Sequence, residues 1–426
     1  MAKLSKFQIV VLCIFGFGVF AGLASLALFK NNSTAETTPS ITVWGVLSET
    51  MFNDYVAQVN TANRTQYIVN YIQKNQATFE RELTEELALG KGPDAVLIPQ
   101  ELLLTIENKL VTIPYTTIGS RDYKNTFIEQ AELYLRSEGS VGIPFVIDPM
   151  VMYWNRDTFT NAGIATYPKT WDDFLPLIKK VTQKDVNSNI RQSAVALGEF
   201  SNIVNARDIF SLILLQAGNP IVSNMRSTLG GDGFEITGNA LKFFTGFSNP
   251  SSPAYSWNRS LPLSKNYFIS GNLATYFGFA GEVLDLRDKN PNLNFDIAPI
   301  PQPKNTKNRV GYGRMYGFSI VKSSKDPNAA LTVLTSLTSA SSLARLVDIT
   351  YLPPVRRDLI AQGNKDPYLS IFYDAALISK GWLDPSPYET AQVFQNFVES
   401  VTSGREIVDS AINQANNELT RLLQKR

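Results

Sequence analysis

Apolar residues along this chain recur with the spacing of a β-strand in some segments and with the spacing of an α-helix in the segments between them. Strand-type apolar runs lie at 41–44, 67–72 and 94–98. Between the second and third runs, Phe79, Leu83 and Leu87 recur at helical spacing before GKGP at 90–93 ends the helix. Such alternation of strands and helices predicts an α/β protein with a mainly parallel sheet covered by helices on both faces.

Several predicted helices carry terminal signals. A hydroxyl residue followed three positions later by an acidic one is typical of a capping box, and this pattern occurs at Thr126–Glu129, Thr170–Asp173 and Ser403–Glu406. Asp326 and Pro327 predict an N-cap and a first helical turn. A last helix is predicted with one packed face, formed by Val408, Ile412, Ala415, Leu419 and Leu422.

The first forty residues differ from the rest. Lys3 and Lys6 precede an uncharged apolar run at 9–29 that is long enough to cross a bilayer as a helix. Its length favours a retained anchor over a cleavable signal peptide, with cleavage near Ala35 as the alternative. The polar stretch 31–40 follows as a flexible tether. We expect a cell-membrane protein with a single-pass N-terminal anchor (1–40) and an extracytoplasmic body, or a secreted one.

Composition narrows the chemistry. The one cysteine, Cys13, lies within the apolar run and follows Val11 and Leu12, where a lipoprotein signal needs small residues. The chain has no histidine, which excludes Ser-His-Asp and Cys-His catalysis and the usual zinc sites. With 39 Lys+Arg against 38 Asp+Glu, it has no basic excess for nucleic acid. We expect no metal, no cofactor and no nucleic-acid partner.

Two proline-containing extended segments look unlike ordinary connections. They are VGIPFVIDPMVMYW at 141–154 and FDIAPIPQP at 295–303. Proline stiffens an extended chain and denies it ladder pairing, so both are predicted to leave one lobe and enter another. Residues 41–426 also exceed the usual size of a single core. The sequence therefore predicts two discontinuous lobes joined by extended crossovers.

These features, in this order, resemble the family 1 extracellular solute-binding proteins of ABC importers, the maltose-binding-protein-like family. The resemblance covers nearly all of 41–423. Its most specific stretches are FERELTEELALGKGPDAVLI (79–98), GIPFVIDPMVMYWNRDTFTNAGI (142–164), PKTWDDF (168–174), FISGNLATYFG (268–278), IAPIPQP (297–303) and GYGRMYGFSIVKSS (311–324).

The resemblance implies a periplasmic-binding-protein-like (venus flytrap) fold that follows a transmembrane helix. Lobe 1 is expected at 41–147 plus 302–350, and lobe 2 at 148–301 plus 351–426. It implies a monomeric receptor, not an enzyme, that binds a sugar or oligosaccharide in the cleft between the lobes. The partners would be this carbohydrate and the ABC permease subunits in the membrane.

Sugar recognition needs aromatic faces for C–H surfaces and polar groups for hydroxyls. Asp148, in the first crossover, matches a cleft carboxylate of the family; the alternative is a turn cap before Pro149. Arg314 and Tyr316 lie among glycines that allow close backbone approach, and at least one is expected to face the ligand. Phe279 stands near where relatives often have a tryptophan.

The other candidates have competing structural roles. Trp44 and Glu49 follow the first strand, where the alternatives are a core ring and a solvated helix start. Gln100 follows the third strand and is otherwise a surface amide. Two further tryptophans, Trp257 in a polar loop and Trp382 in GWLDPSP, are binding or packing residues.

Glu199 matches a second-lobe carboxylate of relatives, with an exposed surface position as its alternative. It also bears on a different function. Two carboxylates suffice for glycoside hydrolysis, and Asp148 with Glu199 is the available pair, although neither lies in a hydrolase motif. A further alternative is a solute-binding sensor module that works without a transporter.

Overall fold

The computed structural model describes residues 40–64 and 67–426. The predicted anchor, Cys13 and the cleavage position therefore lie outside the described residues. Within this part of the chain no single helix is long and apolar enough to cross a membrane. One pair of consecutive helices is long and apolar enough when taken together, but the chain bends by 64° between them; they are Pro327–Leu337 and Ala340–Thr350.

Most strands form one ten-stranded sheet. The strands of the described chain are β1 (Ser40–Gly45), β2 (Ile68–Gln73), β3 (Ala95–Pro99), β4 (Ile113–Pro114), β5 (Gly139–Ser140), β6 (Ile143–Asn155), β7 (Gln183–Lys184), β8 (Ile190–Val195), β9 (Val222–Ser223), β10 (Arg226–Ser227), β11 (Leu273–Phe279), β12 (Phe295–Ala298), β13 (Gly311–Ile320) and β14 (Ser379–Lys380). The sheet order is β2-β1-β3-β13-β6-β11-β8-β7, with β12 beside β6 and β14 beside β13. The three strand runs predicted first in the sequence are thus confirmed as β1, β2 and β3.

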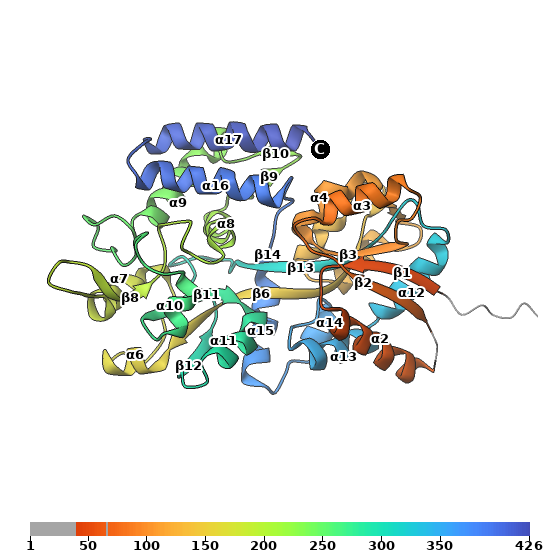
Figure 1. Ribbon diagram of the computed structural model, residues 1–426, viewed down its shortest axis with the longest axis horizontal. Helices are drawn as coiled ribbons and strands as arrows, with labels where there is room; N and C mark the ends of the chain where they lie inside the picture. Colours follow the sequence, from red (N-terminus) through yellow and green to blue (C-terminus); the bar gives the residue numbers. More distant parts are fainter. Residues whose placement is uncertain (1–39, 65–66) are drawn as a thin grey trace, which may run out of the picture.

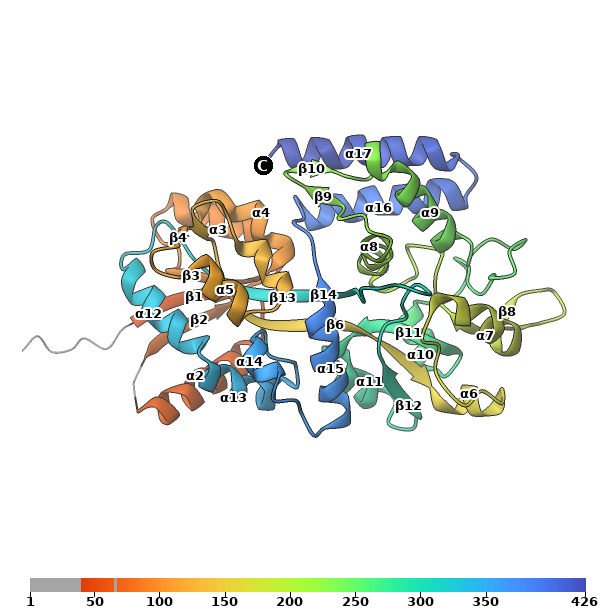
Figure 2. The same ribbon diagram turned by 180° about the vertical axis from the view of Figure 1, so that it is seen from behind.

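Helices gather around the two ends of this sheet (Figures 1 and 2). We call the end with β1–β3, together with the separate β4–β5 sheet, the first body. Its helices are α2 (Glu49–Asn63), α3 (Phe79–Ala88), α4 (Leu103–Ile106), α5 (Ser120–Thr126), α12 (Pro327–Leu337), α13 (Ala340–Thr350) and α14 (Arg357–Ile360). The end with β7–β12 is the second body; its helices are α6 (Arg156–Asn161), α7 (Phe174–Val181), α8 (Ala206–Gln216), α9 (Phe234–Thr245), α10 (Ser264–Ile269), α11 (Val283–Lys289), α16 (Pro387–Thr402) and α17 (Val408–Gln424). Helix α15 (Pro367–Ile378) packs on β6 and β13 between the bodies.

Strand β6 is the first of two long strands that run from one body to the other. Its first half, through Pro149, pairs antiparallel with β13, and its second half, from Met150, pairs with β11 and β12. Nearly all of its side chains are buried because both of its faces are covered. The expected crossover at 141–154 is confirmed.

The second expected crossover, 295–303, is wrong. β12 ends at Ala298 and pairs with β6 inside the second body, and β13 makes the crossing instead. Pro299 cannot donate to a ladder. β13 fits between β3 and β6 because it carries glycines where neighbours approach closely: a Cβ at Gly317 would lie 2.5 Å from the Tyr134 hydroxyl.

Short helical turns complete the connections near the crossing. They are η1 (Gln100–Leu102), η2 (Glu107–Lys109), η3 (Glu129–Tyr134), η4 (Trp171–Asp173) and η6 (Ala280–Glu282). The capping box Thr170–Asp173 is present, and Asp326 caps α12 through the Ala329 amide. The other two predicted boxes are wrong, because Thr126 ends α5 and Ser403 caps the C-terminus of α16. The packed face of α17 is confirmed except at Val408, which is only partly buried.

Candidate functional site

Charged side chains from both bodies meet where β13 passes between them. Arg314 on β13 donates through Nε to Glu101 Oε1 at 3.2 Å and through Nη2 to Asp208 Oδ2 at 3.0 Å. Glu101 belongs to η1 of the first body, at the end of β3, and Asp208 lies in the first turn of α8 in the second body. The guanidinium of Arg314 therefore joins a carboxylate from each body.

Arg207 makes a second set of bridges. Its guanidinium lies 3.5 Å from Glu101 Oε1, 3.0 Å from Asp208 Oδ1 and 2.8 Å from Asp384 Oδ2. Burial raises the pKa of Asp384 to about 6, and the charge of Arg207 opposes that rise. Burial also raises the pKa of Asp208, but Arg207 and Arg314 lower it more, so this carboxyl stays ionised. We call Glu101, Arg207, Asp208, Arg314 and Asp384 the central network.

Asp148 lies beside this network, on β6 directly opposite Arg314. Its carboxylate is partly buried and accepts the Gly281 amide at 2.8 Å. A Cβ at position 281 would lie 3.1 Å from Asp148 Oδ2, so the glycine permits this approach. Burial raises the pKa of Asp148 to about 7, against the lowering effects of the Gly281 hydrogen bond and of Arg314.

Some buried polar atoms near the network have no hydrogen-bond partner in the described chain. They include Glu101 Oε2, Gln130 Oε1 and the hydroxyl of Tyr134. Glu101 and Gln130 are only 2% and 3% exposed. A buried acceptor without a donor costs about 1–3 kcal/mol, so a ligand or water that donates here would be stabilised.

A cavity of about 700 Å³ lies between the two bodies, and no residue of the central network is among the described residues that line it. The first body lines it with Leu104, Lys109 and other residues of α4 and η2. The second body contributes Met225 from the β9–β10 turn, and Leu383, between Trp382 and Asp384, also lines it. No aromatic residue is among the described side chains that line this cavity. Most of the residues that line it are polar or charged.

Three other predicted residues join Asp148 at the crossing. The guanidinium carbon of Arg314 lies 4.3 Å from the ring centre of Phe279, as a cation–π contact. That ring is 2% exposed. Tyr316 is partly buried, and its burial raises its pKa to about 12. Asp148, Phe279, Arg314 and Tyr316 are thus brought together.

Three predicted residues lie at or after the ends of strands of the first body: Trp44 and Gln100 are buried, and Glu49 is exposed. Trp44 is 5% exposed, and the Lys74 ammonium lies 3.9 Å from its ring centre. Glu49 is exposed at the start of α2. Gln100 is fully buried, donates to the Gly313 carbonyl and accepts the Met315 amide, so it holds β13 in place.

The remaining candidates are engaged inside the second body or beside it. Trp257 is fully buried and donates to Asn202 Oδ1 at 3.0 Å. Trp382 is 3% exposed and donates to the hydroxyl of Ser211 on α8. Glu199 is 5% exposed and paired with Arg259 at 3.0 Å. In this conformation neither indole presents a free face, as the core alternative anticipated.

Four charged residues of the network were not expected from the sequence: Glu101, Arg207, Asp208 and Asp384. Each looks locally like an ordinary helix-start or turn residue. Glu101 directly follows the candidate Gln100, and this position at a strand end is the one signal that pointed to it. Within residues 40–64 and 67–426, no group of three or more metal-ligating side chains suited to an ion is found.

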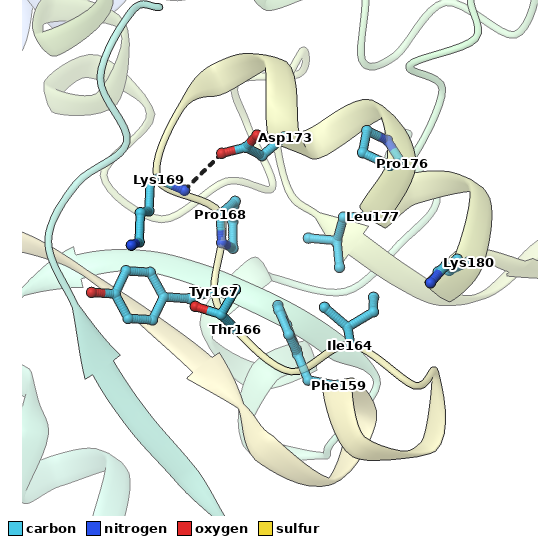
Figure 3. A pocket seen from close by; sticks show the side chains of 10 residues that line it. All are labelled: Phe159, Ile164, Thr166, Tyr167, Pro168, Lys169, Asp173, Pro176, Leu177 and Lys180. Atoms are coloured by element: carbon cyan, nitrogen blue, oxygen red, sulfur yellow. Dashed lines mark hydrogen bonds between the residues drawn. The ribbon is translucent and has the colours of Figure 1, made fainter.

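A second pocket, of about 380 Å³, lies wholly within the second body (Figure 3). Phe159, Ile164 and Leu177 form its apolar floor. Lys169 and Asp173 lie at its edge, where the Asp173 carboxylate accepts the Lys169 amide at 3.0 Å. Among the described residues, those that line it all lie between 159 and 180, so movement between the bodies does not change these walls.

Comparisons with known proteins agree on one family. The family model described as bacterial extracellular solute-binding protein matches residues 57–343. The maltodextrin-binding protein MdxE of Bacillus subtilis (strain 168) is 20% identical, over 96% of this chain and 98% of its own length.

Solved structures resemble the whole body. A cyclic alpha-maltosyl-1,6-maltose binding protein from Arthrobacter globiformis superposes with a TM-score of 0.71 at 16% identity, covering 91% of this chain and 99% of that one. A cyclo/maltodextrin-binding protein complexed with maltotetraose gives a TM-score of 0.70 at 16% identity, covering 92% and 98%. The chain thus has the α/β periplasmic-binding-protein-like fold.

Proposed function

The chain belongs to the bacterial extracellular solute-binding protein family, and from this we propose that it is the receptor of an ABC importer that binds an oligosaccharide between its two bodies. The family consists of solute-binding proteins, not enzymes. The similar proteins named above bind maltodextrins or cyclic maltosyl sugars, which supports a glucose-containing oligosaccharide as the cargo.

The observation that carries this proposal is the cavity between the bodies, which is lined mostly by polar and charged residues. Its volume of about 700 Å³ lies in the range of small-ligand sites. Sugar hydroxyls are donors, and Glu101 Oε2 and Gln130 Oε1 are buried acceptors without one. Neither residue lines the cavity, whose own carboxylate and amide side chains, such as Glu107 and Asn108, offer acceptors to sugar hydroxyls.

We assign the contact residues from the group of predicted side chains that meets where β6 and β13 cross. Asp148, Arg314, Tyr316 and Phe279 form the central group, with Glu101 added from the structure. None of these residues is among the described residues that line the cavity of about 700 Å³. That lining has no aromatic side chain, so the fit of a neutral sugar there would rest on hydrogen bonds more than on ring stacking.

The other predicted residues form a more distant set: Trp44, Glu49, Gln100, Glu199, Trp257 and Trp382. Trp44 and Glu49 lie at the ends of first-body elements, where a larger ligand would reach them. The buried members act by holding the walls of the site.

The division into lobes remains a proposal, with 41–147 plus 302–350 as lobe 1 and 148–301 plus 351–426 as lobe 2. The pairing of β6 and β13 across the middle supports it. Within the last range, α14 contacts α5 and α13, so this helix packs on the first body. The residue limits near 351 are therefore where the boundary would move.

We also propose a membrane location and a membrane partner. The apolar run at 9–29 would anchor the chain, which would keep a monomeric receptor close to the permease subunits. Closure of the two bodies around the sugar would present one shape to that permease.

A thermal-shift screen tests the ligand. The full-length chain in a mild detergent would be heated with maltose, maltodextrins, manno-oligosaccharides, polyols and amino acids. A ligand at 100 times its Kd stabilises the native state by about 2.7 kcal/mol, so oligosaccharides should raise the Tm. A response confined to amino acids would contradict the proposal.

Two variants sharpen this screen. Asp148→Asn should weaken the oligosaccharide response at least tenfold in ligand concentration, because the carboxylate is placed among the contacts. Glu132→Gln removes an exposed ion pair with Lys124 in the first body and should leave the response unchanged. Equal responses in both variants would remove Asp148 from the site.

A further inference from the structure

Ion pairs bridge the two bodies. Glu101 is the member of the central network that the first body supplies, and Arg207 and Asp208 come from α8 of the second. Glu101 contacts Arg207 directly, at 3.5 Å, and reaches Asp208 through Arg314 on the crossing strand. Opening of the bodies would have to separate Glu101 from Arg207, which belongs to α8 of the second body.

Burial sets this bridge apart from other ion pairs. The side chains of Glu101 and Asp208 are 3% and 5% exposed, and those of Arg207 and Arg314 are 14% and 25% exposed. Charges in such surroundings are screened less by salt than surface charges. A second pair between the bodies, Glu80 with Arg426 at 2.8 Å, is 40% and 21% exposed, and pairs of this kind contribute little.

The central network contains more carboxylates than guanidinium groups. Three carboxylates, those of Glu101, Asp208 and Asp384, surround two guanidinium groups, and Glu101 Oε2 accepts no hydrogen bond. A bridge that leaves a buried acceptor unsatisfied is weaker than a complete one. It therefore holds the bodies together while leaving free energy to gain for a ligand that supplies the missing donor.

We propose that Glu101, with Arg207, Arg314 and Asp208, forms a latch that keeps the two bodies closed before any solute binds. Solute entry then requires the latch to open, and a bound solute replaces or completes its contacts. The latch lowers the apparent affinity for the solute, because only the fraction of molecules that is unlatched can bind it. Glu101 is a positioning residue in this scheme, and the scheme holds for any class of solute.

The test measures the separation of the bodies directly, with no solute present. Spin labels would be attached at Asn108→Cys in the first body and Arg226→Cys in the second, in the full-length chain carrying Cys13→Ser, in detergent. Asn108 lines the cavity between the bodies, and Arg226 follows the β9–β10 turn that lines it from the other side. Pulsed electron spin resonance then gives the distance distribution.

The latch predicts a graded response. The unmodified network should give mainly the short distance. Glu101→Gln removes the charge at nearly constant shape, and Glu101→Lys places a third cation beside Arg207 and Arg314. We expect the ratio of long to short distances to rise at least tenfold in the first variant and further in the second.

A matched control is Glu82→Gln, which breaks a partly buried pair with Lys74 inside the first body at 3.0 Å. It should leave the distance distribution unchanged. The proposal is overturned if the protein with an intact network already shows mainly the long distance, or if both Glu101 variants keep the short one. Because no sugar is added, either result leaves the proposed cargo untouched, and a failed sugar screen leaves the latch untouched.

Discussion

The titration of Asp148 predicts in which direction the free energy of unfolding changes with pH. Burial raises the pKa of this carboxyl from its ordinary 3.8 to about 7. The folded protein therefore keeps the proton over a pH interval in which the unfolded chain has released it. Since the unfolded state binds fewer protons there, the free energy of unfolding falls as the pH rises from about 4 to about 7.

The size of this effect follows from the same two pKa values. The difference between about 7 and 3.8 corresponds to about 4 kcal/mol of stability lost across the interval. Arg314 faces Asp148 on β13 and lowers its pKa, whereas the charge of Glu282 raises it. The value near 7 includes both contributions. Asp148→Asn removes the titrating group and keeps an oxygen acceptor for the Gly281 amide.

Urea unfolding of the full-length chain in detergent, followed by tryptophan fluorescence between pH 4.5 and 8, measures this. Other groups titrate alike in both proteins, so the difference isolates Asp148. The unfolding free energy of Asp148→Asn minus that of the unsubstituted chain should rise with pH by several kcal/mol and level off above pH 7. A flat or falling difference would refute the reasoning, since it would mean that Arg314 keeps the buried carboxylate ionised.

Asp173 provides a control of opposite sign. Burial raises the pKa of Asp173, but the Thr170 and Lys169 amides lower it more, so its net pKa is below the ordinary value. Its contribution to stability is present above about pH 4 and is lost as the pH falls through the lowered pKa. For Asp173→Asn the titration is extended below pH 4, where the same difference should fall as the pH rises to about 4 and stay level above it.

Three further predictions concern packing and capping. Trp257→Ala should lower the free energy of unfolding by about 3–5 kcal/mol in urea titrations, because the indole is fully buried; an effect below 1 kcal/mol would contradict the observed burial. Glu199→Gln should cost less than about 1 kcal/mol in the same assay, because its partner Arg259 is half exposed, and a larger loss would show a stronger pair. Asp326→Ala should lower stability by about 1 kcal/mol by removing the cap on the Ala329 amide, and an unchanged urea midpoint would mean that water replaces the cap.

The local pattern of the chain predicted several elements well. The strands β1 to β3 and the helix α3 follow directly from apolar spacing, since a strand or helix of ordinary length is encoded within a few neighbouring residues. β6 was also found, because two prolines in an apolar run leave little besides an extended strand. The second crossover was misplaced, because its strand β13 is rich in glycine and lacks the apolar period of a typical strand.

The candidate site was predicted only in part. Asp148, Phe279, Arg314 and Tyr316 do meet at the crossing, and each lies in a segment that the sequence had marked as unusual. Trp257 and Trp382 were chosen because aromatic residues in loops often bind ligands, yet their rings are buried and their indole nitrogens are already hydrogen-bonded. Sequence position alone does not distinguish these two uses of a tryptophan.

By itself, the sequence determined the α/β class, the order of the early strands and helices, the absence of histidine chemistry and the resemblance to solute-binding proteins. Only the tertiary structure decided which charges face one another. Glu101, Arg207 and Asp384 lie far apart along the chain, and each resembles an ordinary surface charge among its neighbours. Their burial and pairing arise where two bodies close on a shared pair of strands, and that meeting depends on distant contacts that no local period records.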